Sequence, residues 1–223
     1  MSRLLNCFGR IETEVDTSGY PLIDTSVPGQ YEVEMGPGIY RIVLIGGGGG
    51  GAKTQWAAGH NLFYAYAQGG VAATADFFIE TTVACIANIT VGAGGTSDYR
   101  LSGAGTTATN GNSSYILGIP NLTVNCGPGT AGYTAANTAT PGTMGVLTLE
   151  GSSIIKVDMD SNEHPITSST SYSVRNNLNW PTASNLGRGG GATAGSGGTV
   201  WNGGPGYILI KYYNKNYFHP EDL

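Results

Sequence analysis

The stretch that decides the fold is Ile39-Tyr40-Arg41-Ile42-Val43-Leu44-Ile45, which runs directly into six consecutive glycines, Gly46 to Gly51. The seven residues are the strongest apolar run of the chain, and their β-branched side chains predict a buried strand. A glycine run can adopt the extended polyproline II form, in which six residues span roughly 19 Å. Because glycine has no Cβ, such segments can approach until their backbones hydrogen-bond laterally, which must offset the entropy of ordering them. The alternative interpretation is a flexible linker.

Further glycine clusters lie beside other apolar strands, and this favours packed segments over linkers. One cluster follows Val91, and three more lie between Gly187 and Gly206, the last of them directly before the apolar run that starts at Tyr207. Linkers between domains are not usually attached to core strands in this way. We therefore predict structural roles for Gly46, Gly47, Gly48, Gly49, Gly50, Gly51, Gly92, Gly94, Gly95, Gly189, Gly190, Gly191, Gly203, Gly204 and Gly206.

The rest of the hydrophobic pattern predicts strands. They are expected at 30–35, at 74–91 as one strand or as two with a bend, at 121–126 and at 207–213, with a hairpin from 146–149 and 154–159. Residues 52–68 contain enough alanine for a helix, but Gly59, His60 and Asn61 interrupt them, so a loop or a further strand is the alternative. The predicted fold is all-β: an antiparallel β-sandwich-like domain with glycine-rich segments, as polyglycine II or as mobile loops, packed against strands.

Three parts are expected along the chain. Residues 1–30 lack periodicity, which predicts an irregular N-terminal attachment segment. Residues 31–213 form the glycine-rich β domain, in which 145–186 contain few glycines and are interpreted as an inserted hairpin and loop. Residues 214–223 form a polar C-terminal tail. A length of 223 residues and a mass of 23.0 kDa suit one such domain with short appendages.

The composition excludes several classes of protein. Charged residues make up 11% of the chain, where about a quarter is usual, but hydrophobic residues remain at 40%, which excludes the signature of disorder. A net charge of −5 without any basic run argues against a nucleic-acid partner. The first residues are too weakly apolar for a signal peptide, and no apolar run approaches the roughly 18 residues of a membrane span. We expect synthesis in a cytoplasm without a signal peptide, and no membrane insertion.

Two nucleotide-binding patterns are met only in part. Gly46, Gly48 and Gly51 fit the dinucleotide fingerprint G-x-G-x-x-G, as any hexaglycine does. That fingerprint requires a following helix and an acidic residue about 20 residues later. The first acid here is Asp76, after a poorly helical stretch. The phosphate-binding P-loop requires adjacent Gly-Lys-Thr, and an alanine separates Gly51 from Lys53.

The metal-binding and nucleophilic patterns are equally incomplete. Asp158, Asp160 and Asn162 resemble the start of a calcium loop, but its sixth and twelfth positions are Glu163 and Ser169 instead of glycine and glutamate. The histidines and cysteines lack ligand spacing: His60, His164, His219, Cys7, Cys85 and Cys126. We interpret Cys85 and Cys126 as small buried residues in strands. The sequence predicts no catalytic residues, no metal site and no cofactor, and a glycan-cleaving or nucleotide-dependent enzyme is the disfavoured alternative.

Four motifs in order give the chain a family resemblance from about Tyr31 to Tyr212. It resembles the glycine-rich domain of bacteriophage tail-fibre and tail-tip, adhesin-like proteins. The matching motifs are the strand, Pro-Gly turn, apolar strand and hexaglycine of 31–51, Ile89-Thr90-Val91-Gly92-Ala93-Gly94-Gly95, the pair Gly111–Tyr115 and Leu122–Gly127, and the closing Gly203–Tyr212.

This resemblance implies a non-enzymatic virion protein of a tail fibre or tail tip that takes part in host-surface recognition. Related adhesins cap a longer fibre and carry sandwiches of polyglycine II helices with variable loops at the tip. Implied partners are other virion proteins or copies of itself, and a bacterial surface glycan or outer-membrane protein. Because aromatic side chains supply contact area at low entropy cost, candidate receptor-binding residues are Trp56, His60, Tyr64, Tyr66, Tyr172 and Trp180. The alternative function is a structural or decorating subunit of a capsid, tail or extracellular filament without a receptor-binding role.

Overall fold

The apolar run before the hexaglycine forms β3 (Gly38–Ile45), the central strand of a five-stranded antiparallel sheet. The computed structural model describes residues 21–58, 61–101, 103–136, 138–161, 186–193 and 198–213. The sheet has the order β1-β15-β3-β6-β14, and β3 pairs with both neighbours so that Ile42 lies opposite Ile210 and Phe77. The other strands are β1 (Pro21–Thr25), β6 (Thr74–Thr81), β14 (Ile154–Asp160) and β15 (Tyr207–Tyr213).

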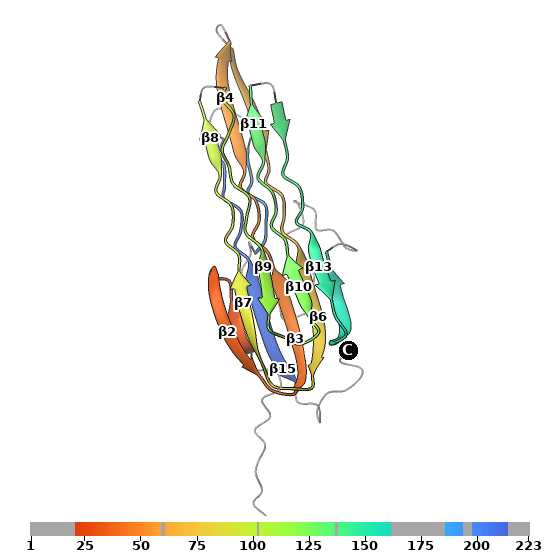
Figure 1. Cartoon of the computed structure of the whole chain (residues 1–223). Coiled ribbons are helices and arrows are strands. Elements are labelled where there is room, and N and C mark those ends of the chain that lie inside the picture. Colours follow the sequence, from red (N-terminus) through yellow and green to blue (C-terminus); the bar gives the residue numbers. More distant parts are fainter. Residues whose placement is uncertain are drawn as a thin grey trace, which may run out of the picture.

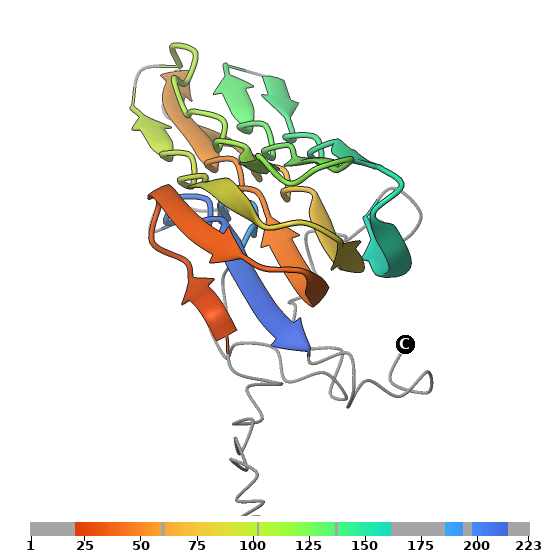
Figure 2. The ribbon, with the colours of Figure 1, turned by 60° about the horizontal axis from the view of Figure 1, so that its bottom comes forward.

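A second five-stranded antiparallel sheet packs against the first and encloses an apolar core (Figure 2). Its order is β13-β10-β9-β7-β2, from β2 (Gly29–Met35), β7 (Cys85–Val91), β9 (Ser114–Leu117), β10 (Thr123–Cys126) and β13 (Leu147–Glu150). We call these two sheets the base sandwich. Its core includes the buried residues Ile42, Leu44, Phe77, Ile79, Ile89, Ile116, Val124, Cys126, Ile208 and Ile210.

The hexaglycine leaves the base sandwich as an extended segment that other extended segments surround (Figure 1). Its N–H groups donate hydrogen bonds to three neighbouring segments in turn, and the same segment is the acceptor at every third residue. The bonds, 2.9–3.1 Å long, run from Gly46 and Gly49 to 70–73, from Gly47 and Gly50 to 109–112, and from Gly48 and Gly51 to 201–204. A threefold repeat of lateral hydrogen bonds is what a chain with three residues per turn produces, which is the geometry of polyglycine II.

The carbonyl groups of Gly47 to Gly51 also form lateral hydrogen bonds. They accept hydrogen bonds from three further segments, through the N–H groups of Gly95, Asp98, Gly129, Gly132 and Gly190. Gly46 to Gly51 therefore form the centre of a bundle with six neighbouring segments. We call this bundle the polyglycine stack, and it consists of residues 46–51, 68–73, 92–97, 104–113, 127–132, 141–146, 187–191 and 201–206.

Glycine is required in the centre of the stack because no space is left for a side chain. A Cβ atom on Gly48 would lie 1.9 Å from the carbonyl oxygen of Arg188, and one on Gly49 would lie 1.9 Å from that of Thr130. None of the central glycines has the left-handed φ that disfavours other residues, and Gly187 is the one described stack glycine that does. The close approach of backbones, rather than an unusual backbone angle, therefore explains the run.

Beyond the stack the chain returns to pleated strands and forms a small head at the opposite end from the base sandwich (Figure 1). A three-stranded sheet has the order β5-β4-β8, in which β5 is antiparallel and β8 parallel to β4. A hairpin of β11 and β12 packs against it. The bounds are β4 (Ala52–Ala58), β5 (Asn61–Ala67), β8 (Asp98–Arg100), β11 (Tyr133–Ala135) and β12 (Thr138–Thr140).

The structure confirms the all-β sandwich fold and the packed glycines, and it settles two open points. Residues 52–68 form the strand alternative, as the hairpin of β4 and β5, and not the helix. Residues 74–91 form two strands in different sheets. Val83 lies at the bend between them and is 53% exposed.

Two predictions about chain organisation are wrong. The segment 1–30 was expected to be irregular, but β1 lies within it and pairs with β15, and Tyr207 donates a 2.8 Å hydrogen bond to Asp24. The expected hairpin at 146–159 is an arch, because β13 pairs with β10 in one sheet and β14 with β6 in the other. Its strands form edges of both sheets, so this part of 145–186 is no insertion. Residues 162–185 and 214–223 lie outside the described residues.

Candidate functional site

The outer surface of the head carries a group of aromatic side chains. Side chains alternate along a strand, and the register of β4 with β5 places Lys53 opposite Tyr66 and Gln55 opposite Tyr64. The parallel pairing of β4 with β8 places Tyr99 beside Lys53. The three tyrosines therefore share one face of the sheet, which we call the tyrosine face.

The ammonium group of Lys53 contacts two of these rings. Its side chain is fully buried, and its ammonium nitrogen donates a 2.9 Å hydrogen bond to the carbonyl of Gly198. The same nitrogen lies 5.4 Å from the ring centre of Tyr64 and 5.2 Å from that of Tyr99, within the range of cation–π attraction. Tyr99 also donates a 2.6 Å hydrogen bond to Oε1 of Gln55. Both rings are thus held in place before any ligand arrives.

The tyrosine face remains accessible to a ligand. Tyr66 is 47% exposed, Tyr99 is 39% exposed, and Leu62, on the same face of β5, is 55% exposed. Exposed aromatic and apolar groups at one position are typical of a contact surface. They stand out here because few charged groups surround them: the head carries Lys53, which is buried, and Asp98 and Arg100, which are paired with each other.

Trp56 lies on the opposite face of the same hairpin. Its ring stacks on Phe63, with ring centres 5.7 Å apart and planes inclined by 18°. The backbone at Gly103 also lies close to it, because a Cβ atom there would lie 3.3 Å from that of Trp56. Phe63 is 41% exposed. Trp56 and Phe63 therefore form a second aromatic group, partly covered by the head itself.

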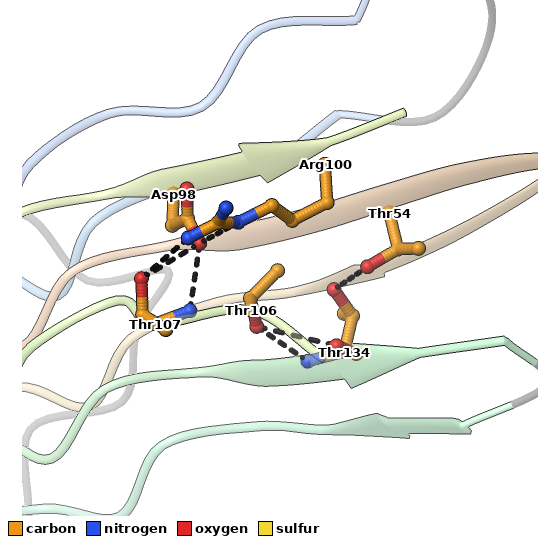
Figure 3. A network of polar contacts seen from close by, with 6 residues as sticks. All are labelled: Thr54, Asp98, Arg100, Thr106, Thr107 and Thr134. Carbon is orange, nitrogen blue, oxygen red and sulfur yellow. Dashed lines mark hydrogen bonds and ion pairs between the residues drawn. The ribbon is translucent and has the colours of Figure 1, made fainter. Parts of the chain in front are cut away.

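The interior of the head contains a group of threonine hydroxyls beside small apolar side chains such as Ala65 and Ala67 (Figure 3). Oγ1 of Thr54 lies 2.7 Å from Oγ1 of Thr134, and both residues are fully buried. Thr106 completes the group, since its N–H donates to the carbonyl of Thr134 at 2.9 Å and its Oγ1 accepts from the Thr134 N–H at 2.9 Å. Hydrogen bonds with fixed directions therefore set how the two head sheets meet.

A second polar network holds β8 against the neighbouring segment (Figure 3). Oδ2 of Asp98 accepts hydrogen bonds from Nε of Arg100 at 2.7 Å and from the N–H and Oγ1 of Thr107 at 2.7 and 3.1 Å. Partial burial raises the pKa of Asp98, but the bonds from Thr107 and Arg100 outweigh it, so the pKa falls below its ordinary value. Asp98 is therefore a carboxylate that positions β8, and with it Tyr99.

The structure brings together some of the predicted recognition residues and separates others. Tyr64 and Tyr66 lie together on the tyrosine face, whereas Trp56 lies on the other face. His60, Tyr172 and Trp180 lie outside the described residues. Sequence reasoning missed Tyr99 and Leu62. Leu62 alternates with Tyr64 and Tyr66, which is a usable signal, but only the parallel pairing of β4 and β8 reveals Tyr99.

The glycines that fit the dinucleotide fingerprint have no room for a phosphate. The N–H groups of Gly46, Gly48 and Gly51 already donate to neighbouring carbonyls. Asp76, which would be the ribose-binding acid, is fully buried and receives both Nε and a terminal nitrogen of Arg41, at 2.9 and 2.6 Å. Neither the phosphate contact nor the ribose contact of a dinucleotide site can therefore form here.

The described residues offer no other chemical centre. Asp158, the first residue of the calcium-like pattern, forms a 3.0 Å ion pair with Lys156. Within the described ranges no three His, Cys, Asp or Glu side chains gather as a metal site would require. Burial raises the pKa of the Cys85 thiol, which disfavours the nucleophilic thiolate. Cys126 is fully buried and donates to the carbonyl of Leu44.

No protein-family model matches the chain, and no curated protein is significantly similar to it in sequence. In the part of the chain that the structure describes, no helix is long and apolar enough to cross a membrane.

Proposed function

We propose that this chain is a non-enzymatic component of a bacteriophage virion, in a tail fibre or tail tip, and that its head recognises the host surface. The observation that carries the proposal is the tyrosine face, a preorganised and exposed aromatic surface at the far end of an elongated molecule. The head binds a surface glycan or an outer-membrane protein. The base sandwich faces other virion proteins or further copies of the chain.

The polyglycine stack supports this proposal because it acts as a stiff spacer. The N–H groups of Gly46 to Gly51 and the carbonyls of Gly47 to Gly51 are bonded laterally, so the segment cannot bend without breaking bonds to several neighbours. The head is therefore kept at a fixed distance and orientation from the base. Binding by rigid groups avoids much of the entropy that flexible side chains and loops lose on association.

The first test is the position of the chain on phage particles. Gold-labelled antibody on particles purified from the source, viewed by electron microscopy, should label a tail tip or the end of a fibre. Label along a shaft or over a capsid would favour the structural or decorating subunit instead. Particles without any label would overturn the virion proposal.

The second test addresses the tyrosine face itself. Alanine replacement of Tyr66 or Tyr99 should weaken binding of the purified chain to host cells about tenfold or more, as expected of aromatic hot spots. Tyr133→Ala is the matched control, because Tyr133 is 46% exposed but lies on β11, in the other head sheet. Equal binding by all three variants would exclude the tyrosine face as the contact surface.

A further inference from the structure

An exposed tryptophan lies on the flank of the polyglycine stack. Trp201 is 50% exposed, yet its backbone is fixed on both sides: its N–H donates to Gly191 at 3.0 Å, and its carbonyl accepts from Gly51 at 3.1 Å. Its ring rests against Gly191, where a Cβ atom would lie only 2.7 Å from Cε3 of the ring. The ring is therefore held firmly by glycine backbone while half of its surface remains open.

The ring borders a groove of about 640 Å³ with polar side chains, a size typical of ligand sites. Its lining includes the exposed residues Gln68, Arg188, Thr193 and Asn202, with Pro205 beside them. Oδ1 of Asn202 accepts hydrogen bonds from the N–H and Oγ of Ser97, at 2.8 and 3.0 Å. These bonds fix the amide and leave its NH2 group as a donor toward a ligand.

Arg188 is the unusual member of this groove. The other described arginines, Arg41 and Arg100, are paired with carboxylates, and so is Lys156. The guanidinium of Arg188, in contrast, makes no hydrogen bond or ion pair with any residue that the structure describes. An exposed and unengaged guanidinium offers a planar fork of donors that suits a carboxylate.

The chemistry of the groove selects a class of ligand. An aromatic ring held flat at a surface presents a large apolar face, which complements the C–H face of a pyranose ring. Amide and hydroxyl groups pair with sugar hydroxyls, and the guanidinium pairs with an acid group. We propose that this groove binds an acidic sugar residue of a polysaccharide, with the ring stacked on Trp201 and the carboxylate on Arg188. The proposal does not depend on recognition by the tyrosine face.

The test uses the full chain and a defined probe, a hexasaccharide that contains glucuronic acid. The matched probe is the same hexasaccharide with its carboxyl groups reduced to alcohols. Titration is followed by NMR of the indole N–H signals of the three tryptophans, assigned by single substitutions. The expected result is a shift of the Trp201 signal by the acidic probe, with at least about tenfold weaker binding of the reduced probe.

Substitutions at Arg188 and Trp201 complete the design, and the melting temperature of each variant is compared with that of the wild type. Arg188→Gln should lower affinity for the acidic probe about tenfold and leave the reduced probe unaffected. Trp201→Ala lacks the Trp201 signal, so its titration is followed by the NMR signal of the Asn202 side-chain amide, which lines the same groove. This variant should bind neither probe, and Trp201→Phe, followed in the same way, should restore part of the binding. Tyr133→Ala, in the head, is the control and should bind as the wild type does.

Three outcomes would overturn the proposal. The first is no binding of the acidic probe at millimolar concentration, and the second is binding that neither Arg188→Gln nor Trp201→Ala changes. The third is preference for a glutamate-rich peptide of equal charge, which would make the groove a site for acidic peptides. Because the readout is the Trp201 signal, failure here leaves the proposal for the tyrosine face untouched, and failure of the cell-binding test leaves this one standing.

Discussion

The base sandwich and the polyglycine stack are formed by consecutive parts of the same chain segments, yet different contacts stabilise them. In the base, β3 buries Ile42 and Leu44 completely between two sheets. In the stack, Gly46 to Gly51 are buried just as fully, but they contribute no side chain. Their contacts are backbone hydrogen bonds to the segments around them. One continuous chain thus changes from side-chain packing to backbone packing at the step from Ile45 to Gly46.

The comparison shows why the two parts differ in tolerance. Side chains keep packed sheets about 10 Å apart, and apolar cores can repack around many substitutions if volume is conserved. In the stack the backbones themselves touch, so at each of Gly46 to Gly51 a neighbouring carbonyl occupies the place where a Cβ would lie. A displaced carbonyl would also lose its own hydrogen bond. The base should therefore tolerate changes of shape, whereas the stack should tolerate almost none.

The largest effect is expected in the base, from Phe77→Ala. Phe77 is fully buried in the core between the sheets, and its truncation removes most of a large side chain and leaves a cavity. The free energy of unfolding should fall by about 3–5 kcal/mol, measured by denaturant titration. Phe77→Leu should recover more than half of this loss. Equal losses for both variants would mean that the core around Phe77 cannot repack.

A single methyl group should have a comparable effect in the stack. Gly49→Ala places a Cβ against the carbonyl oxygen of Thr130, which is itself bonded to Gly70. We expect a loss of about 2–3 kcal/mol, the upper part of the range for overpacking. Gly36→Ala is the matched control, because nothing lies within 4 Å of its Cβ position, and its stability should stay within about 0.5 kcal/mol of the wild type. If Gly49→Ala behaves like Gly36→Ala, the stack is not closely packed.

The same contrast explains what the sequence predicts and what it leaves open. Apolar runs predict strands such as β3 and β15. The glycine run indicates close backbone packing, because no other residue fits there. The segments that pair with each other in the stack cannot be predicted, because glycine has no side chain that would favour one neighbouring segment over another. The prediction of a hairpin from β13 and β14 is wrong for a related reason. Their short turn suits either a hairpin or a crossing between sheets, and only the tertiary pairing decides.

The head was the least predictable region. Its strands contain alanine, threonine and aromatic residues, so they carry no clean apolar period, and β4 was expected as a helix, a loop or a strand. Tyr64 and Tyr66 could be predicted to share a face once β5 is taken as a strand. Tyr99 could not be placed beside them, because a parallel pairing between 52–54 and 98–100 depends on how the stack aligns both segments.

Thr134→Val tests whether the head depends on hydrogen bonds where the base depends on apolar contact. Valine has nearly the same shape but leaves the buried hydroxyl of Thr54 without its partner at 2.7 Å. The expected loss is about 1–2 kcal/mol in the free energy of unfolding. Thr138→Val, on an exposed position of β12, should change stability by less than about 0.5 kcal/mol. An unchanged or increased stability of Thr134→Val would show that the head interior behaves like the apolar base.

The smallest effect should come from Asp98, and it should depend on pH. The folded chain holds the pKa of Asp98 below its ordinary value of 3.8, so the bonds from Thr107 and Arg100 contribute stability above that pH. This contribution should be lost as the pH falls from 3.8 through the lower folded pKa. At pH 7 Asp98→Asn should cost about 0.5 kcal/mol, because the pair is partly exposed. The difference from the wild type, followed by thermal unfolding, should shrink below pH 3.8. A difference that persists in acid would mean that Asp98 acts through shape and neutral hydrogen bonds, as the threonines of the head do, and not through its charge.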